Sequence, residues 1–148
     1  MKTTVTIDSS AFSADIAAIL RRTSGEKLLP AVKAGGFVVE GAAEINIREK
    51  LYRHPTGNLM NSINVKAGKT TAHSASVTIG TNVIYAAIHE FGGTIKAKNA
   101  PYLCFVVDGN FVKTKSVEIP ARPYLRPALN DNKGKIVQAM GVQLAKLI

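Results

Sequence analysis

Three prolines lie close together near the C-terminal end of the chain, at positions 120, 123 and 127. A proline can neither donate a hydrogen bond to a sheet ladder nor sit inside a helix, and it pushes the residue before it toward extended geometry. The segment 117–127 is therefore predicted to be a stiff, irregular strap. Such a strap would set Tyr124 and Leu125 against the rest of the protein and hold Arg122 and Arg126 at defined positions.

A short helix is predicted just before the strap. Two adjacent rows of side chains occur there at helical spacing, and we expect the helix to pack through them. The rows are Ile84, Ile88 and Phe91 in one, and Tyr85 and His89 in the other. Gly92 and Gly93 follow, and glycine takes a positive φ without a Cβ clash, so they should end the helix. The chain should then continue extended over 94–97, which makes the helix a wedge between strands.

The longest predicted helix runs from Pro30 to about Leu51. Proline suits the first turn of a helix, where its missing N–H is not needed. Apolar or small residues recur at three- and four-residue steps, as on one face of a helix: Leu29, Val32, Gly36, Val39, Ala43 and Ile47. Gly35 and Gly36 each lower the helix propensity by about 1 kcal/mol, so we expect a close backbone contact there to compensate.

The N-terminal residues predict a strand and a helix. Residues 3–7 alternate apolar and polar side chains, as a half-buried strand does. Ser9 or Ser10 can cap a short helix that ends near the turn at 21–25. The residues on the apolar face of this helix are Phe12, Ile16, Ile19 and Leu20.

Two hairpins are predicted further along. Segments 63–67 and 75–80 alternate apolar and polar residues on either side of a polar turn. Segment 102–107 predicts a largely buried strand, 108–110 a tight turn, and 111–119 its antiparallel partner with one polar face.

Two more helical segments complete the chain. Thr56 or Asn58 can cap a short turn that runs through Leu59 to Ile63, and Asn130 or Asp131 can cap the last helix. The apolar stripe of the last helix is expected to comprise Ile136, Met140, Leu144 and Leu147. This order of elements predicts an α+β fold: a mostly antiparallel sheet with the long N-terminal-half helix and the C-terminal helix packed on one face, and long hairpin or loop extensions.

Length and composition indicate one domain over residues 1–148, since no repeat or linker interrupts a chain that is long enough to bury a core. No apolar run approaches the ~20 residues of a membrane span, and no signal peptide is evident, so the protein should be cytosolic when made. The single cysteine, Cys104, lies between Leu103 and Phe105 and is expected to be a buried, inert thiol. The net charge of +9 favours attraction to DNA or to an acidic protein surface.

Catalytic and metal-binding patterns are missing from the sequence. His89-Glu90 resembles the start of the zinc protease pattern H-E-x-x-H, but position 93 is glycine, so the second ligand is absent. We expect His89 to be a packed or hydrogen-bonded histidine, and Glu90 to pair with a nearby Lys or Arg. No nucleophile elbow and no phosphate loop occurs. The sequence therefore predicts a protein that is not an enzyme and that carries no cofactor or metal.

Four ordered blocks resemble a known family: 56–63 (TGNLMNSI), 79–86 (IGTNVIYA), 89–93 (HEFGG) and 119–128 (IPARPYLRPA). They are similar, in order and spacing, to the tail-completion or neck proteins of tailed bacteriophages. Such proteins are also called head-tail joining proteins, minor tail components or virion morphogenesis proteins. The resemblance covers the chain from about Pro30 onward. Its structural motif residues are Thr56, Gly57, Leu59, Ser62, Gly80, Tyr85, His89, Glu90, Phe91, Gly92, Gly93, Pro120, Arg122, Pro123, Leu125 and Pro127.

The resemblance implies a structural virion protein at the head-tail junction, with the α+β architecture described above. It also implies assembly into a ring, for which six copies is one option, that contacts the tail terminator on one side and head connector or stopper proteins on the other. We expect exposed cations to make such contacts, and some of them could touch genomic DNA without sequence preference. The candidate interface residues are Lys66, Lys69, Lys96, Lys98, Lys113, Lys115, Arg122 and Arg126. Two alternatives stay open: a basic DNA-binding protein, and a morphogenesis factor absent from the mature virion.

Overall fold

The computed structural model describes residues 23–51 and 57–147. The strand expected at 3–7, the helix expected before residue 22 and the cap expected from Thr56 lie outside these residues. The elements in chain order are α2 (Gly25–Leu51), α3 (Asn58–Ser62), β1 (Asn64–Ala67), β2 (Val77–Gly80), α4 (Ala86–Phe91), β3 (Gly93–Lys96), β4 (Leu103–Val107), β5 (Asn110–Thr114), β6 (Ser116–Ile119), α5 (Leu125–Asn130), α6 (Lys133–Leu144) and the 3-10 helix η2 (Ala145–Leu147).

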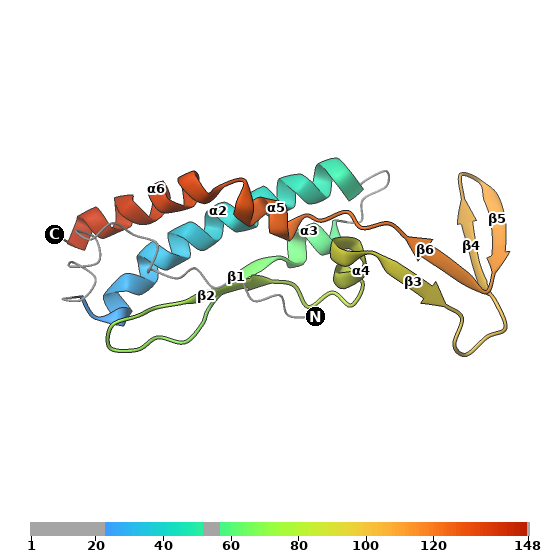
Figure 1. The fold of residues 1–148 in the computed structure, drawn as a ribbon, viewed down its shortest axis with the longest axis horizontal. Coiled ribbons are helices and arrows are strands. Elements are labelled where there is room, and N and C mark those ends of the chain that lie inside the picture. Colours follow the sequence, from blue (N-terminus) through green and yellow to red (C-terminus); the bar gives the residue numbers. More distant parts are fainter. Residues whose placement is uncertain (1–22, 52–56, 148) are drawn as a thin grey trace.

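The described chain is elongated and consists of a body and an arm (Figure 1). The body contains α2, α3, α5, α6 and the β1–β2 hairpin, and the arm contains β3, β4, β5 and β6. Helix α4 and residues 120–124 of the strap form the junction between them. No helix of the described residues is both long and apolar enough to cross a membrane.

Helix α2 is the centre of the body, and α6 and the β1–β2 hairpin contact different sides of it (Figure 1). A Cβ added to Gly35 would lie 3.0 Å from Met140 of α6, and a Cβ added to Gly36 would lie 2.8 Å from Val65 of β1. The close contact expected at this glycine pair is therefore confirmed, although the neighbouring atoms belong to side chains. Glycine is needed because its missing Cβ makes room for them.

The predicted apolar stripe of α2 is largely confirmed. Val39, Ala43 and Ile47 are fully buried, and they pack in one core with β2, α5 and α6. The other buried members of this core are Val32, Leu59, Ile63, Val77, Ile79, Ala86, Tyr124, Leu125, Ala128, Ile136 and Met140. This core fixes the arrangement of the body, since protein interiors are packed as densely as crystals.

Helix α2 starts at Gly25, which is earlier than the predicted start at Pro30. The loop after β1 explains the difference, because the N–H of Gly25 donates to the carbonyl of Ala72. An added Cβ at Gly25 would collide with the carbonyl oxygens of Thr71 and Ser74. The loop therefore fixes the helix start from outside, which local sequence does not reveal.

The N-caps predicted for α3 and α6 are also wrong. The N-cap of α3 is Gly57, at φ 72°, and not Asn58. Asn130 ends α5, so it does not cap α6. The N-cap of α6 is Asn132, which makes no side-chain capping bond.

The last apolar stripe is confirmed for Ile136, Met140 and Leu144. Leu147 is 41% exposed because the chain leaves the α-helical path and ends in η2.

The α+β class is confirmed, but the described strands form three separate two-stranded antiparallel sheets and not one sheet. β1 pairs with β2, β3 with β6, and β4 with β5. The segment 111–119 was predicted as one strand, and it breaks at Lys115. At this break the hydroxyl of Thr114 donates to the carbonyl of Ser116 at 2.9 Å. The two halves therefore pair with different partners.

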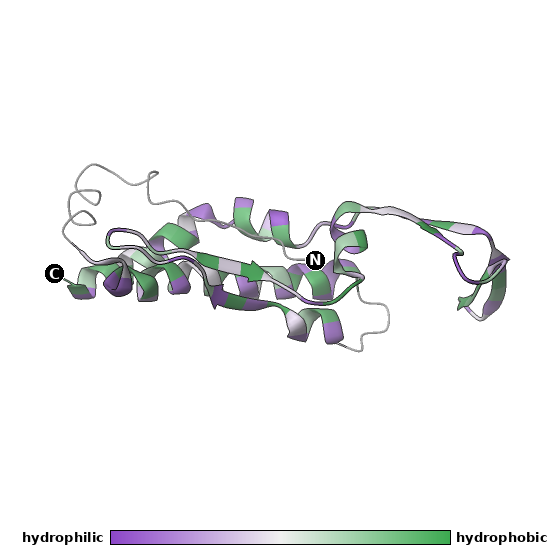
Figure 2. Ribbon diagram, turned by 90° about the horizontal axis from the view of Figure 1, so that it is seen from below, coloured by the Kyte–Doolittle hydropathy of each residue, from purple (hydrophilic) through white to green (hydrophobic). Residues whose placement is uncertain are grey.

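The tight turn predicted at 108–110 is confirmed. Asp108 and Gly109 have φ of 49° and 80°, as the favoured two-residue hairpin turn requires. The burial predicted for this hairpin is wrong, because Cys104, Val106 and Val107 are exposed. The hairpin stands at the far end of the arm, away from the body core, and its apolar residues are visible in Figure 2.

The packing predicted for α4 is also wrong. Ile84, Tyr85 and Phe91 are 92%, 44% and 50% exposed, and the buried residues of α4 are Ala86 and Glu90. Since α4 lies at the edge of the body, one side of this short helix meets the core, and that side was not the predicted one.

The strap prediction is confirmed in part. Tyr124 and Leu125 are buried as expected, and residues 120–123 have no regular structure. Helix α5, however, begins at Leu125, because Pro127 occupies its first turn, where a missing N–H costs little.

Candidate functional site at the junction of body and arm

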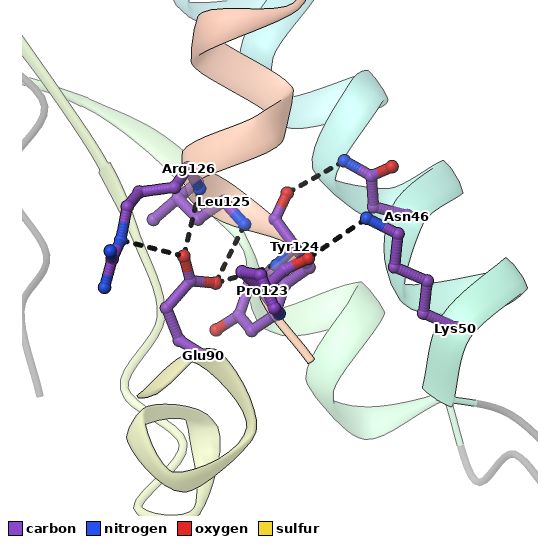
Figure 3. Close-up of polar contacts among 7 residues, drawn as sticks. All are labelled: Asn46, Lys50, Glu90, Pro123, Tyr124, Leu125 and Arg126. Carbon is purple, nitrogen blue, oxygen red and sulfur yellow. Dashed lines mark hydrogen bonds and ion pairs between the residues drawn. The ribbon is translucent and has the colours of Figure 1, made fainter. Parts of the chain in front are cut away.

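Glu90 is the polar centre of the junction. Its side chain is 2% exposed, and its carboxylate accepts three backbone hydrogen bonds from the start of α5 (Figure 3). Oε2 accepts from the N–H of Tyr124 at 2.8 Å and of Leu125 at 2.9 Å, and Oε1 accepts from the N–H of Arg126 at 3.0 Å. The first N–H groups of a helix have no partner within that helix. Glu90 of α4 therefore caps α5 from a distance.

This cap is electrostatically favourable as well. A negative charge at a helix N-terminus interacts well with the partial positive charge there. Tyr124, at the N-cap position of α5, makes no side-chain capping bond of its own. The cap thus depends on a residue that precedes α5 by more than thirty positions, so it couples two distant segments of the chain.

Arg126 covers the outer side of this arrangement. Its Nε lies 3.8 Å from Oε1 of Glu90, and its guanidinium carbon lies 4.8 Å from the centre of the Phe91 ring. The expected pairing of Glu90 with a nearby arginine is confirmed. Because 63% of the Arg126 side chain is exposed, this ion pair adds less than the three hydrogen bonds beneath it.

Helix α2 holds the same strap from the body side. Asn46 Nδ2 donates to the carbonyl of Tyr124 at 2.9 Å, and Lys50 Nζ donates to the carbonyl of Pro123 at 3.2 Å (Figure 3). Burial, together with the charge of Glu90, raises the pKa of Tyr124 to about 12. Asn46 and Lys50 were not predicted from the sequence, because one polar residue within a long helix forms no pattern.

The glycine pair after α4 lets the strap approach closely. Gly92 has φ 70° and Gly93 φ 150°, which confirms the predicted positive φ values. A Cβ on Gly92 would lie 2.8 Å from the backbone nitrogen of Ala121. Next to it, the N–H of Arg122 donates to the carbonyl of His89 at 2.7 Å, and burial, with a smaller effect of the Arg122 charge, lowers the pKa of His89. Two segments are thus fixed side by side where the β3–β6 sheet begins, at the pair of Gly93 and Ile119.

A second polar contact joins the other two sequence blocks. The hydroxyl oxygens of Ser62 and Thr81 lie 2.5 Å apart, and Ser62 also donates to the carbonyl of Leu59. Thr81 is buried and accepts from the N–H of Val83. The structure therefore brings the blocks together in pairs, 56–63 with 79–86 and 89–93 with 119–128.

The remaining motif residues have supporting positions. Gly57 starts α3, Gly80 ends β2, and Leu59 is buried in the core. In the strap, Pro120 is exposed, and Pro123 and Pro127 are half-buried.

The eight candidate interface cations are all exposed, and they do not form one patch. Lys66 and Lys69 belong to the β1–β2 hairpin of the body, and Arg122 and Arg126 belong to the junction. The others lie on the arm (Figure 1): Lys96, Lys98, Lys113 and Lys115. Lys113 Nζ sits 4.4 Å from the centre of the Tyr102 ring.

The geometry of the junction fits a role in holding segments of the chain together. The carboxylate of Glu90 is occupied by N–H donors and is shielded from solvent, so it is poorly placed to act as a base or a ligand. No group of three or more His, Cys, Asp or Glu within 23–51 and 57–147 could hold a metal ion. The site therefore positions the arm against the body.

Comparison with known proteins gives one match. Residues 40–146 match the model of a family described as the phage virion morphogenesis family. The matched region begins within α2 and includes all four sequence blocks, the junction and the arm. No curated protein and no solved structure matches the chain.

Proposed function

Because this chain belongs to the phage virion morphogenesis family, we propose that it is a structural virion protein that completes the tail and joins it to the head. A role in phage morphogenesis follows from the family itself. The proposal adds the place, the head-tail junction, and the form, a ring of identical subunits around the axis of the particle. Its other partners would be the tail terminator on one side and head connector or stopper proteins on the other.

One observation carries this proposal. The junction fixes, through buried hydrogen bonds, an arm with exposed apolar side chains: Val106 is 65% exposed and Phe111 69% exposed. A fixed projection with an uncovered apolar surface is typical of a protein that binds another protein. A subunit that reaches toward its neighbour head-to-tail can close into a ring if the rotation permits.

Analysis of purified virions tests the proposal. Mass spectrometry should find this chain in virions, and an amber mutant should accumulate filled heads and separate tails. A chain that is needed for assembly and yet is absent from virions would support the morphogenesis factor instead.

Binding to DNA is the test of the other alternative. Contact through surface lysines without sequence preference should weaken steeply as salt rises above ~0.15 M. Tight, sequence-dependent binding near that salt concentration, without any rings in negative-stain images, would overturn the structural proposal.

A further inference from the structure

The hairpin at the end of the arm has one fully exposed face. Cys104 pairs with Lys113 and Val106 pairs with Phe111, and paired residues in an antiparallel ribbon point to the same side. Cys104 and Val106 are two residues apart, so both pairs lie on one face. All four residues are exposed, which gives an apolar surface with a lysine at its edge.

This hairpin lacks support of its own. An isolated two-stranded hairpin is marginally stable in water and needs a further layer against its apolar face. The two core clusters of the described residues include no residue of β4 or β5. The hairpin is also held away from the body by the β3–β6 ribbon (Figure 1). Neither core of the described residues supplies that layer.

The outward side of α2 offers a surface of matching character. Phe37, Gly41 and Ile45 follow one another at four-residue steps and so share a face. Phe37 is 56% exposed and Ile45 46% exposed, and a Cβ on Gly41 would meet no atom within 4 Å. This face therefore has a shallow notch between two exposed apolar side chains.

Two carboxylates border the notch. Glu40 and Glu44 lie one helical turn apart, and neither has an ion-pair partner among the described residues. Burial and the charge of Glu44 raise the pKa of Glu40, against a smaller lowering by the backbone at Val65. Lys33 and Arg48 lie beyond the pair toward the two ends of the helix. A cation placed between the carboxylates would relieve their repulsion.

We propose that the β4–β5 hairpin of one copy docks on the outward face of α2 in a second copy. Phe111 lies in the notch at Gly41, and Lys113 faces Glu44. Spacing agrees with this arrangement, since residues two apart on a strand are about 7 Å apart and residues three apart on a helix have Cβ atoms about 5–6 Å apart. The inference rests on the proposed self-assembly and names the two surfaces that make it.

The charge pattern favours a second copy over nucleic acid. A phosphate backbone is bound by cations, and it gains nothing from the exposed Val106 and Phe111. The α2 face supplies both apolar side chains and carboxylates. Because the donor and acceptor surfaces differ, each copy both gives a hairpin and receives one, as a ring requires.

A cysteine cross-link tests the contact directly. Cys104 is the single cysteine of the chain, so Ile45→Cys adds one thiol on the proposed receiving face. Under mild oxidation, the full-length variant should yield a disulfide between positions 104 and 45 of different copies, identified by peptide mapping. Val142→Cys is the matched control, an exposed aliphatic residue of α6, and should give no disulfide between positions 104 and 142.

Charge exchange supplies a second test. Lys113→Glu and Glu44→Lys should each raise the concentration needed for half-assembly by up to about tenfold, and the double variant should restore it. Rings that form normally without the 104–45 disulfide and without a charge effect would overturn this docking and leave the proposed function standing. A chain that stays monomeric under all conditions would overturn both. Loss of DNA binding with unchanged rings in Lys113→Glu would assign the arm to DNA and also overturn the docking.

Discussion

The body and the arm differ in how closely their side chains are packed. In the body, a Cβ added to Gly36 of α2 would lie only 2.8 Å from Val65. In the arm, Phe111 is 69% exposed. In the body and junction, the buried carboxylate of Glu90 accepts three hydrogen bonds. Each of the two described sheets of the arm has two strands. The comparison teaches that the packing that stabilises the chain lies in the body and the junction, so the arm can be altered separately.

The largest expected effect follows from removing the cap in the junction. Glu90→Ala leaves three backbone N–H groups without an acceptor, and we expect it to lower the free energy of unfolding by about 3–5 kcal/mol. Urea denaturation followed by circular dichroism measures this change. Glu90→Gln should cost less, because the amide keeps one acceptor oxygen.

A matched carboxylate on the arm is the control for this experiment. Glu118 of β6 is exposed, and Glu118→Ala should change the free energy of unfolding by less than about 0.5 kcal/mol. Equal losses at both positions would contradict the division between junction and arm.

The ionisation of Tyr124 should give the next effect, at alkaline pH. Its folded pKa of about 12 lies above the ordinary value of 10.0, so the folded state keeps a proton that the unfolded state loses. The stabilisation is fully present below pH 10 and should be lost as the pH rises toward 12, by about 2–3 kcal/mol for two pKa units. Tyr124→Phe should remove this part of the loss. An identical pH dependence in the wild type and the variant would show that Tyr124 is not shielded.

The sequence predicted the body better than the arm, for a physical reason. Helical spacing identified Val39, Ala43 and Ile47, because a long helix exposes its period over many turns. The apolar neighbours of Cys104 predicted its burial wrongly, since an apolar sequence shows which residues prefer burial and not whether anything lies against them. In the arm, the exposed apolar side chains lie against neither core of the described residues.

The junction was predicted only in part for a related reason. The positive φ values of Gly92 and Gly93 could be predicted from the sequence, because glycine is the residue that adopts them most readily. Glu90, by contrast, joins positions more than thirty residues apart, and the contributions of Asn46 and Thr81 depend on tertiary contacts. The four blocks could be recognised as blocks, but which pairs with which required the structure.

Substitutions of two glycines compare the buried and the exposed side of α2, and their expected effects on stability are smaller. Gly36→Ala should destabilise the fold by about 1–3 kcal/mol, because Val65 and Val77 must move. Gly41→Ala should stabilise it by about 0.5–1 kcal/mol through helix propensity, since the new methyl group meets no atom within 4 Å. Thermal unfolding of the monomer measures both changes. Equal effects would mean that Val65 and Val77 can move away from the new methyl group at position 36 without loss of stability.

The smallest effect on stability should come from the arm, and it sharpens the comparison most. Phe111→Ser removes a side chain that is already 69% exposed, so we expect the free energy of unfolding to change by less than about 0.5 kcal/mol. If the arm serves contacts between molecules, the same change should markedly weaken self-association in analytical ultracentrifugation. Leu125→Ser, in the buried core, should do the reverse and unfold the chain before any assembly is measured. A Phe111→Ser variant that unfolds readily yet assembles normally would place the arm among the stabilising parts of the fold and remove the distinction between the two regions.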